Sequence, residues 1–261
     1  MSIQPAPAEP PAIPSGYPGA TWAFHQARLA GFPLRIPSWG MGDVLICLLG
    51  SLTFSAVALF ALSKNHIDPE HGWGLVLAFM SPWVFLAGWP LVTAYVKGNG
   101  PTIDFGLTLH RPHIRLGILA GLVSLALATL AASITVQLLG PISSSAGDMA
   151  SKQHGPILIV FALLALVGAP LVEELAFRGL LFGALLKSQF TPVLASLTSA
   201  GVFALFHFEP KRLLVLFVVG FVLGEARRRS GSTMTSVVAH AVNNAPGVLA
   251  LLGMNIGFIV L

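Results

Sequence analysis

Apolar segments long enough to cross a lipid bilayer follow one another along most of this chain. A transmembrane helix needs about 20 predominantly apolar residues. Only 9% of the 261 residues are charged and 55% are hydrophobic, whereas about 25% are charged in ordinary soluble domains. The sequence therefore predicts an all-α, polytopic membrane helix bundle with spans near 44–63, 73–96, 116–139, 157–186, 191–208, 213–226, 233–245 and 247–261.

The number of spans depends on Pro246. A proline either bends a helix or separates two helices, so the pattern predicts about seven or eight transmembrane helices. Gly220 and Gly224 are four residues apart, a spacing that favours close packing of two membrane helices.

The amino-terminal region differs from the rest of the chain. Its proline density favours extended, disordered backbone, and Trp22 and Phe24 are suited to the membrane interface. We therefore expect a proline-rich disordered cytoplasmic tail over 1–40 and a transmembrane helical domain over 41–261. The prolines in question are Pro5, Pro7, Pro10, Pro11, Pro14 and Pro18.

The loop charges predict an orientation. Basic residues gather in two loops, and an excess of Lys and Arg marks cytoplasmic loops. The two loops share a side with the tail, so we expect a multi-pass membrane protein with its amino terminus inside. These charges fit a bacterial cytoplasmic membrane, and an internal eukaryotic membrane would have the same pattern. Lys211 and Arg212 do not fit this pattern. The residues that do are Lys97, Arg111 and Arg115 in one loop and Arg227, Arg228 and Arg229 in the other.

Composition also bears on partners. The net charge of +4 comes from basic residues scattered one to three at a time between apolar runs, and a nucleic-acid-binding face would gather them. The expected partner surface is the lipid bilayer, with no nucleic acid. A single cysteine, Cys47, permits no intrachain disulfide.

A few ionisable side chains lie inside the predicted spans. A charge at the bilayer centre costs about 2.5–3.5 kcal/mol on insertion scales, so such groups face the bundle interior and mark a functional site by default. Glu174 and Arg178 are four residues apart on one helix face and are expected to form an ion pair. Glu173, about 100° round the helix, has no local cation and is the candidate general base.

Two further spans bring polar groups to the interior. His207 ends one span, and His240 and Asn244 share a face of another because they are four residues apart. Asn243 points elsewhere and has a weaker, supporting role. Any one of these residues alone is accounted for by helix packing, but their occurrence on three spans is not.

Three motifs carry a family resemblance. Residues 173–178, EELAFR, have the pattern EExxxR. Residues 203–207, FALFH, have the pattern FxxxH, and residues 240–244, HAVNN, have the pattern HxxxN. In this order and spacing they resemble the CPBP family of intramembrane proteases, also called the Abi or CAAX-protease family, which includes the type II CAAX prenyl endopeptidases. The resemblance places a protease core at about 150–250.

The resemblance implies an intramembrane endopeptidase that hydrolyses peptide bonds of membrane-associated or lipidated proteins or peptides. By matching positions, Glu173 and His207 activate the attacking water. His240 and Asn244 steady the developing oxyanion, which is often the largest catalytic contribution. The supporting residues are Glu174, Arg178, Phe203 and Asn243.

A metal is left open by the resemblance, since the family has been described as both metallo- and glutamate-dependent. Glu173, His207 and His240 are residue types that ligate zinc together with a water. The sequence has no HExxH motif, and a carboxylate with a neutral imidazole activates water without a metal. We expect no required cofactor.

Two other functions stay open. A catalytically silent relative acting as a membrane scaffold or bacteriocin immunity factor is the second interpretation, because an intact motif does not demonstrate turnover. A transporter with a buried proton relay is the third. It predicts interrupted helices in both halves of the chain, whereas Gly168-Ala169-Pro170 has no clear counterpart.

Overall fold

The computed structural model describes residues 21–253, and within this range it contains helices and no strand, as predicted. The first half runs through α1 (Trp22–Leu29), α2 (Met41–Lys64), α3 (Gly72–Met80), α4 (Trp83–Leu86), α5 (Gly88–Lys97), α6 (Pro101–Asp104) and α7 (Arg111–Leu139). The second half runs through α8 (Ser145–Ser151), α9 (Gly155–Leu163), η1 (Leu164–Gly168), α10 (Ala169–Glu174), η2 (Leu175–Leu181), α11 (Phe182–Lys187), α12 (Pro192–Phe206), η3 (Pro210–Arg212), α13 (Leu213–Ser230) and α14 (Thr233–Leu251).

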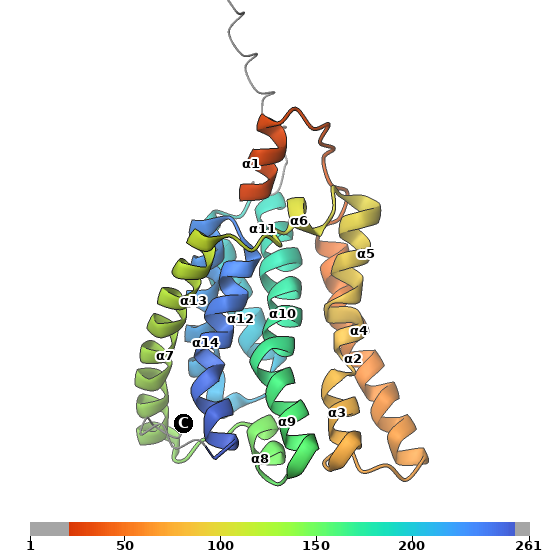
Figure 1. The fold of residues 1–261 in the computed structure, drawn as a ribbon, viewed down its shortest axis with the longest axis vertical. Helices are drawn as coiled ribbons and strands as arrows, with labels where there is room; N and C mark the ends of the chain where they lie inside the picture. The colour runs from red at the N-terminus through yellow and green to blue at the C-terminus, as the bar shows by residue number, and fades with distance from the viewer. Residues whose placement is uncertain (1–20, 254–261) are drawn as a thin grey trace, which may run out of the picture.

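The helices form an upright bundle of membrane-spanning length. Four helical stretches are long and apolar enough to cross a bilayer, namely Met41–Lys64, Gly72–Lys97, Arg111–Leu139 and Gly155–Lys187. In Figure 1 the stretch from α9 to α11 stands between α2–α5 on one side and α7, α12, α13 and α14 on the other. The chain is an integral membrane protein built as a helix bundle.

Pro246 lies inside α14, which continues to Leu251. Of the two alternatives predicted for this proline, the structure therefore has one helix and no separation at 246. The predicted last span, 247–261, does not begin as a helix of its own, and its final residues, 254–261, lie outside the described range.

The predicted disordered tail is wrong for residues 21–40, where the structure is ordered. The Thr21 side chain caps α1 by accepting from the backbone N–H of Phe24, and it also donates to the carbonyl of Ile103 at 2.5 Å. Phe24 and Trp39 are fully buried. The six prolines behind the prediction all lie within residues 1–20, so the structure corrects only the extension of the tail to residue 40. Residues 1–20 lie outside the described range.

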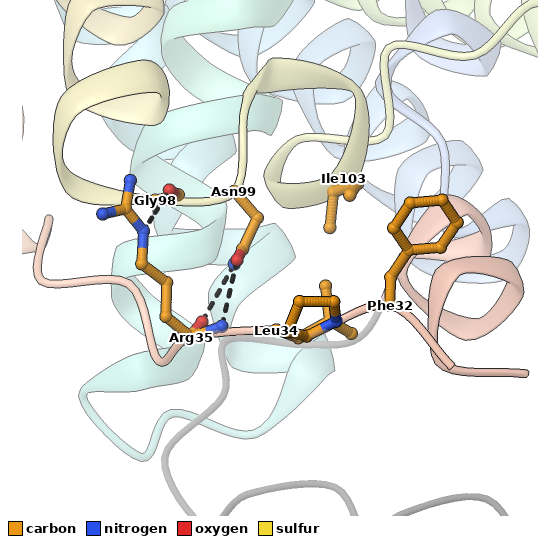
Figure 2. Close-up of a pocket in the computed structure, with 7 residues that line it drawn as sticks. Phe32, Leu34, Arg35, Gly98, Asn99 and Ile103 are labelled. Carbon is orange, nitrogen blue, oxygen red and sulfur yellow. Dashed lines mark hydrogen bonds between the residues drawn. The ribbon is translucent and has the colours of Figure 1, made fainter. Parts of the chain in front are cut away.

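Polar contacts fasten residues 35–39 to the bundle. Lys187 Nζ donates to the carbonyls of Pro37 and Trp39 at 2.5 and 2.7 Å. Figure 2 shows Arg35 donating from Nε to the Gly98 carbonyl at 2.5 Å and exchanging two hydrogen bonds with Asn99. A cavity of about 370 Å³ lies between residues 32–35 and residues 98–103. Arg35 thus satisfies a carbonyl just after the end of α5, one of the groups that a helix end leaves unpaired.

The basic loops meet at one end of the bundle. The α6–α7 and α13–α14 connections are joined by a hydrogen bond from Thr233 N to the Gly106 carbonyl, and Trp22 stacks on His110 with ring centroids 5.0 Å apart. At the opposite end, Glu209 pairs with Arg212. This pairing neutralises part of the charge in the one loop that departs from the predicted pattern.

Glycines permit the closest helix contacts around α13 and α14. A Cβ at Gly220 would stand 3.1 Å from Ala200 Cα, and one at Gly224 would stand 3.2 Å from Ser196 Cβ, so the predicted close packing at this pair is confirmed between α12 and α13. On the other side, a Cβ at Gly121 of α7 would stand 2.6 Å from Val242 Cβ and 2.7 Å from the Ala239 carbonyl of α14.

We predict that Gly121→Ala destabilises the protein because the added methyl group overpacks the α7–α14 contact, at a cost of about 1–3 kcal/mol. Gly201→Ala is the matched control, since a Cβ at Gly201 of α12 meets nothing within 4 Å and alanine favours a helix over glycine. Thermal unfolding in detergent should fall for the first variant and stay unchanged or rise for the second. Equal unfolding temperatures would contradict the packing assigned to Gly121.

Candidate active site

The two acidic residues of the site lie in a helix with widened turns on both sides. Glu173 and Glu174 end the short α-helical segment α10, and the π-helical segments η1 and η2 flank it. Wide turns are frequent at functional sites because they change the direction of the side chains and free backbone carbonyls. Pro170 at the start of α10 is accommodated by the wide turn before it.

Glu174 holds two partners in the interior. Its Oε1 accepts from Arg178 Nη1 at 3.0 Å, as the four-residue spacing predicted, and from His240 Nδ1 of α14 at 2.9 Å. Glu174 and Arg178 are both 0% exposed. The carboxylate therefore joins the helix that carries it to α14 and also fixes the orientation of the His240 ring.

Arg178 is also fastened to α13. Its Nη2 donates to the Gly220 carbonyl at 2.7 Å, and its own backbone carbonyl accepts from Arg227 Nε at 3.2 Å. A second carbonyl of η2, that of Phe177, accepts from Ser199 Oγ at 3.0 Å. Side chains of α12 and α13 thus satisfy carbonyls of the widened turn.

Phe203 lies at the centre of these groups. Its ring centroid is 4.5 Å from that of His207 and 5.9 Å from that of His240, and the Arg178 guanidinium lies over it at 4.7 Å. A cation over an aromatic face is attracted by the ring. The predicted supporting residue therefore packs against both imidazoles and the buried cation.

Glu173 faces both imidazoles. Its Oε2 lies 4.0 Å from His207 Nε2 and 4.0 Å from His240 Nε2. These separations are too long for direct hydrogen bonds and suit bridging by a water, which hydrogen-bonds at about 2.8 Å to each side. The two imidazoles, predicted on separate spans, thus both face one carboxylate oxygen of Glu173, which lies on a third span.

The hydrogen bonds of each ring assign its proton. His207 Nδ1 lies 2.7 Å from the Phe203 carbonyl, and His240 Nδ1 lies 2.9 Å from the Glu174 carboxylate. Both partners only accept, so each Nδ1 donates. The other ring nitrogen, Nε2, faces Glu173 in both histidines. There it accepts a proton or, if it is already protonated, donates one.

The two asparagines have different surroundings. Asn244 Nδ2 donates to the Ala165 carbonyl in η1 at 3.1 Å, which leaves the second amide hydrogen for another acceptor. Asn243 Oδ1 accepts from Ser124 Oγ of α7 at 2.9 Å. Asn243 thus points away from Glu173, as predicted, and its hydrogen bond fastens α14 to α7.

The site does not fit zinc with these side-chain positions. Tetrahedral zinc with bonds of about 2.0–2.1 Å holds its ligand atoms roughly 3.4 Å apart, and Glu173 Oε2 is 4.0 Å from each Nε2 atom. Across residues 21–253, no group of three or more His, Cys, Asp or Glu side chains has an arrangement that suits a metal ion. The donor types alone would suit zinc.

A cavity of about 280 Å³ opens beside Glu173 and His207. Phe177 and Phe206 line the cavity together with these two residues. The remaining lining residues come from α2, from α3 and α4, and from the break between them, and they are Ser55, Ala78, Phe79, Pro82, Trp83 and Leu86.

Fold and site together define an integral membrane protein with a carboxylate and two imidazoles inside a helix bundle. Residues 155–246 match the family model described as type II CAAX prenyl endopeptidase Rce1-like. The resemblance predicted from the three motifs is thereby confirmed over this segment. No curated protein and no solved structure matches the chain.

Sequence reasoning missed part of the surroundings of the site. It identified neither the hydrogen bond between Glu174 and His240 nor the contacts of Ser199 and Arg227 with η2. It also gave the first spans no place at the site, although Trp83 and its neighbours line the cavity. The Ser81-Pro82 pair inside an apolar run was the one available signal for irregular backbone beside a cavity.

We predict that Arg178→Ala lowers stability in detergent strongly, because it leaves the Glu174 carboxylate buried without its cation. Breaking a buried pair in this way costs about 3–5 kcal/mol. Arg228→Ala is the matched control, since Arg228 pairs with Glu225 near the surface and exposed pairs contribute about 0–1 kcal/mol. Thermal unfolding of both variants measures the difference. An unchanged Arg178→Ala unfolding temperature would mean that Glu174 has another source of stabilisation.

Proposed function

We propose that this protein is an intramembrane endopeptidase that hydrolyses a peptide bond with a water activated by Glu173 and His207. The observation that carries the proposal is the position of Glu173, whose carboxylate faces two imidazole Nε2 atoms at 4.0 Å and lines an open cavity. A carboxylate next to a neutral imidazole acceptor is suited to remove a proton from water.

In the proposed reaction, the water oxygen attacks the substrate carbonyl carbon while Glu173 and His207 take up its proton. The carbonyl oxygen becomes an oxyanion. The bond between carbon and nitrogen then breaks as that proton passes to the leaving nitrogen. One water is consumed, and the products are a carboxylic acid and an amine.

His240 and Asn244 are the proposed oxyanion donors. His240 donates through Nδ1 to Glu174, so it donates to an oxyanion through Nε2 only when both nitrogens carry protons. Asn244 contributes the amide hydrogen that is not directed to Ala165. Preorganised donors of this kind lower the barrier to acyl transfer substantially.

The proposed chemistry is glutamate-dependent and requires no metal. The two versions differ at His240, because zinc ligation needs a bare Nε2 lone pair, whereas oxyanion stabilisation needs a proton there. The distances around Glu173 Oε2 favour a water over a zinc ion at this position.

The proposed substrates are membrane-associated or lipidated proteins or peptides, and the proposed location is a bacterial cytoplasmic membrane. The basic loops at the α1 end of the bundle support an orientation with this end in the cytoplasm. The cavity wall is largely apolar, which suits a substrate that is itself embedded in the membrane.

We predict that Glu173→Gln abolishes cleavage while the protein stays folded, because glutamine keeps the shape and removes the base. Glu70→Gln, in the exposed α2–α3 loop, is the matched control and should cleave at the wild-type rate. The assay uses purified protein in liposomes with prenylated and plain fluorogenic peptides. A Glu173→Gln rate close to wild type would refute the proposed base. If the wild type cleaved none of these peptides, the scaffold interpretation would be favoured.

The same assay with a zinc chelator separates the two mechanisms. Cleavage by the wild type should survive prolonged incubation with the chelator, because the proposed water activation uses only side chains. A metalloprotease treated in parallel shows that the chelator is effective. Loss of cleavage that is restored by added zinc would replace the glutamate-dependent mechanism with a metal-dependent one.

A further inference from the structure

We infer that the cavity beside Glu173 and His207 is a subsite for one apolar substrate side chain, and that Trp83 together with Gly168 sets the size it accepts. The inference rests on the proposed function for its kinetic test and on the cavity geometry for its location. Trp83 belongs to α4 and Gly168 ends η1, so the pair joins the first half of the chain to the helix that carries Glu173.

The composition of the cavity defines the class of ligand. Apart from Glu173 and His207, its lining is aliphatic or aromatic with Ser55 as the single polar side chain. An apolar enclosure favours an apolar group because burial removes that group from water or lipid headgroups. At about 280 Å³ the space is just below the range of about 300–1,000 Å³ usual for whole small-molecule ligands. It therefore suits a side chain next to the scissile bond.

Trp83 occupies its position because residue 168 has no side chain. A Cβ at Gly168 would stand 2.5 Å from Trp83 Cη2 and 2.9 Å from Cζ3, both closer than any normal contact. On another side, Phe79 packs edge-on against the indole with centroids 5.6 Å apart, and Phe161 packs on Phe79 at 4.7 Å. The indole thus packs against Gly168 and Phe79 and also lines the cavity.

Two substitutions in this contact should change the subsite in opposite directions. Trp83→Ala removes the indole and enlarges the cavity. Gly168→Ala places a methyl group where the indole edge lies and displaces the ring toward the cavity, which reduces its size. A hydrophobic pocket discriminates about 10-fold or more per methylene, so both changes fall in a measurable range.

The test compares peptides that differ only in the residue next to the scissile bond, which is Ala, Val, Leu or Phe. Relative to wild type in liposomes, Trp83→Ala should raise the ratio of kcat/KM for Phe over Ala by about 10-fold or more, and Gly168→Ala should lower it by a similar factor. The controls are Trp73→Ala, a tryptophan 60% exposed in the same span, and Gly201→Ala. Both should keep the wild-type ratio.

A binding measurement keeps the inference testable without turnover. Dissociation constants for uncleavable peptides, N-methylated at the scissile bond, should show the same opposite shifts in size preference. Trp83→Phe, with a smaller ring, should be intermediate and covers the case in which an alanine variant does not fold.

The outcomes separate the two proposals. Shifted binding without any cleavage would support the subsite and reject the endopeptidase. Cleavage that depends on Glu173 with unchanged size preference in both variants would overturn the subsite and leave the endopeptidase standing. Equal shifts in Trp73→Ala would also overturn it, because Trp73 does not line the cavity.

Discussion

The arrangement of the site depends on one carboxylate in a place that water does not reach. Glu174 and Arg178 are both fully buried, and an ionised group in the membrane interior is stable only with compensating partners. Because Glu174 Oε1 binds both Arg178 and His240, the need to compensate this charge also fixes the imidazole of α14 in place. The same requirement brings Arg178 against the backbone of α13 at Gly220.

The π-helical segments η1 and η2 lie in the helix that carries Glu173, and their backbone contacts several neighbouring helices. A helix carbonyl oxygen has two lone pairs, so it can accept from a side chain in addition to a backbone N–H. In η1 and η2 the carbonyls of Ala165, Phe177 and Arg178 accept from side chains of α14, α12 and α13. The irregular backbone thus joins the helix that carries Glu173 to three of the helices packed around it.

The parts of the site that follow from helix periodicity could be predicted from the sequence. The Glu174–Arg178 pair, the shared face of His240 and Asn244, and the different direction of Asn243 depend only on spacing along one helix. The Glu174–His240 bond could not be predicted, because it depends on how α10 and α14 pack and on wide turns that alter the helix phase.

For the fold, too, features set by the local sequence could be predicted, and features that depend on residues far along the chain could not. Hydropathy predicted the four helical stretches that are long and apolar enough to cross a bilayer, since a bilayer imposes their length. The order of residues 21–40 was not visible, because it rests on partners such as Ile103 and Lys187 far along the chain. Likewise, only packing reveals that Trp83 borders the cavity, since the neighbouring Ser81-Pro82 pair signals irregular backbone but not what that backbone faces.

The hydrogen bonds from Lys187 to Pro37 and Trp39 join residues 150 and 148 positions apart. Chains are synthesised at about 5–20 residues per second, so roughly 8–30 s separate the appearance of these partners during translation. The segment that leaves the ribosome early therefore waits while most of the bundle is inserted. Its docking on α11 becomes possible only after α2–α11 have been synthesised.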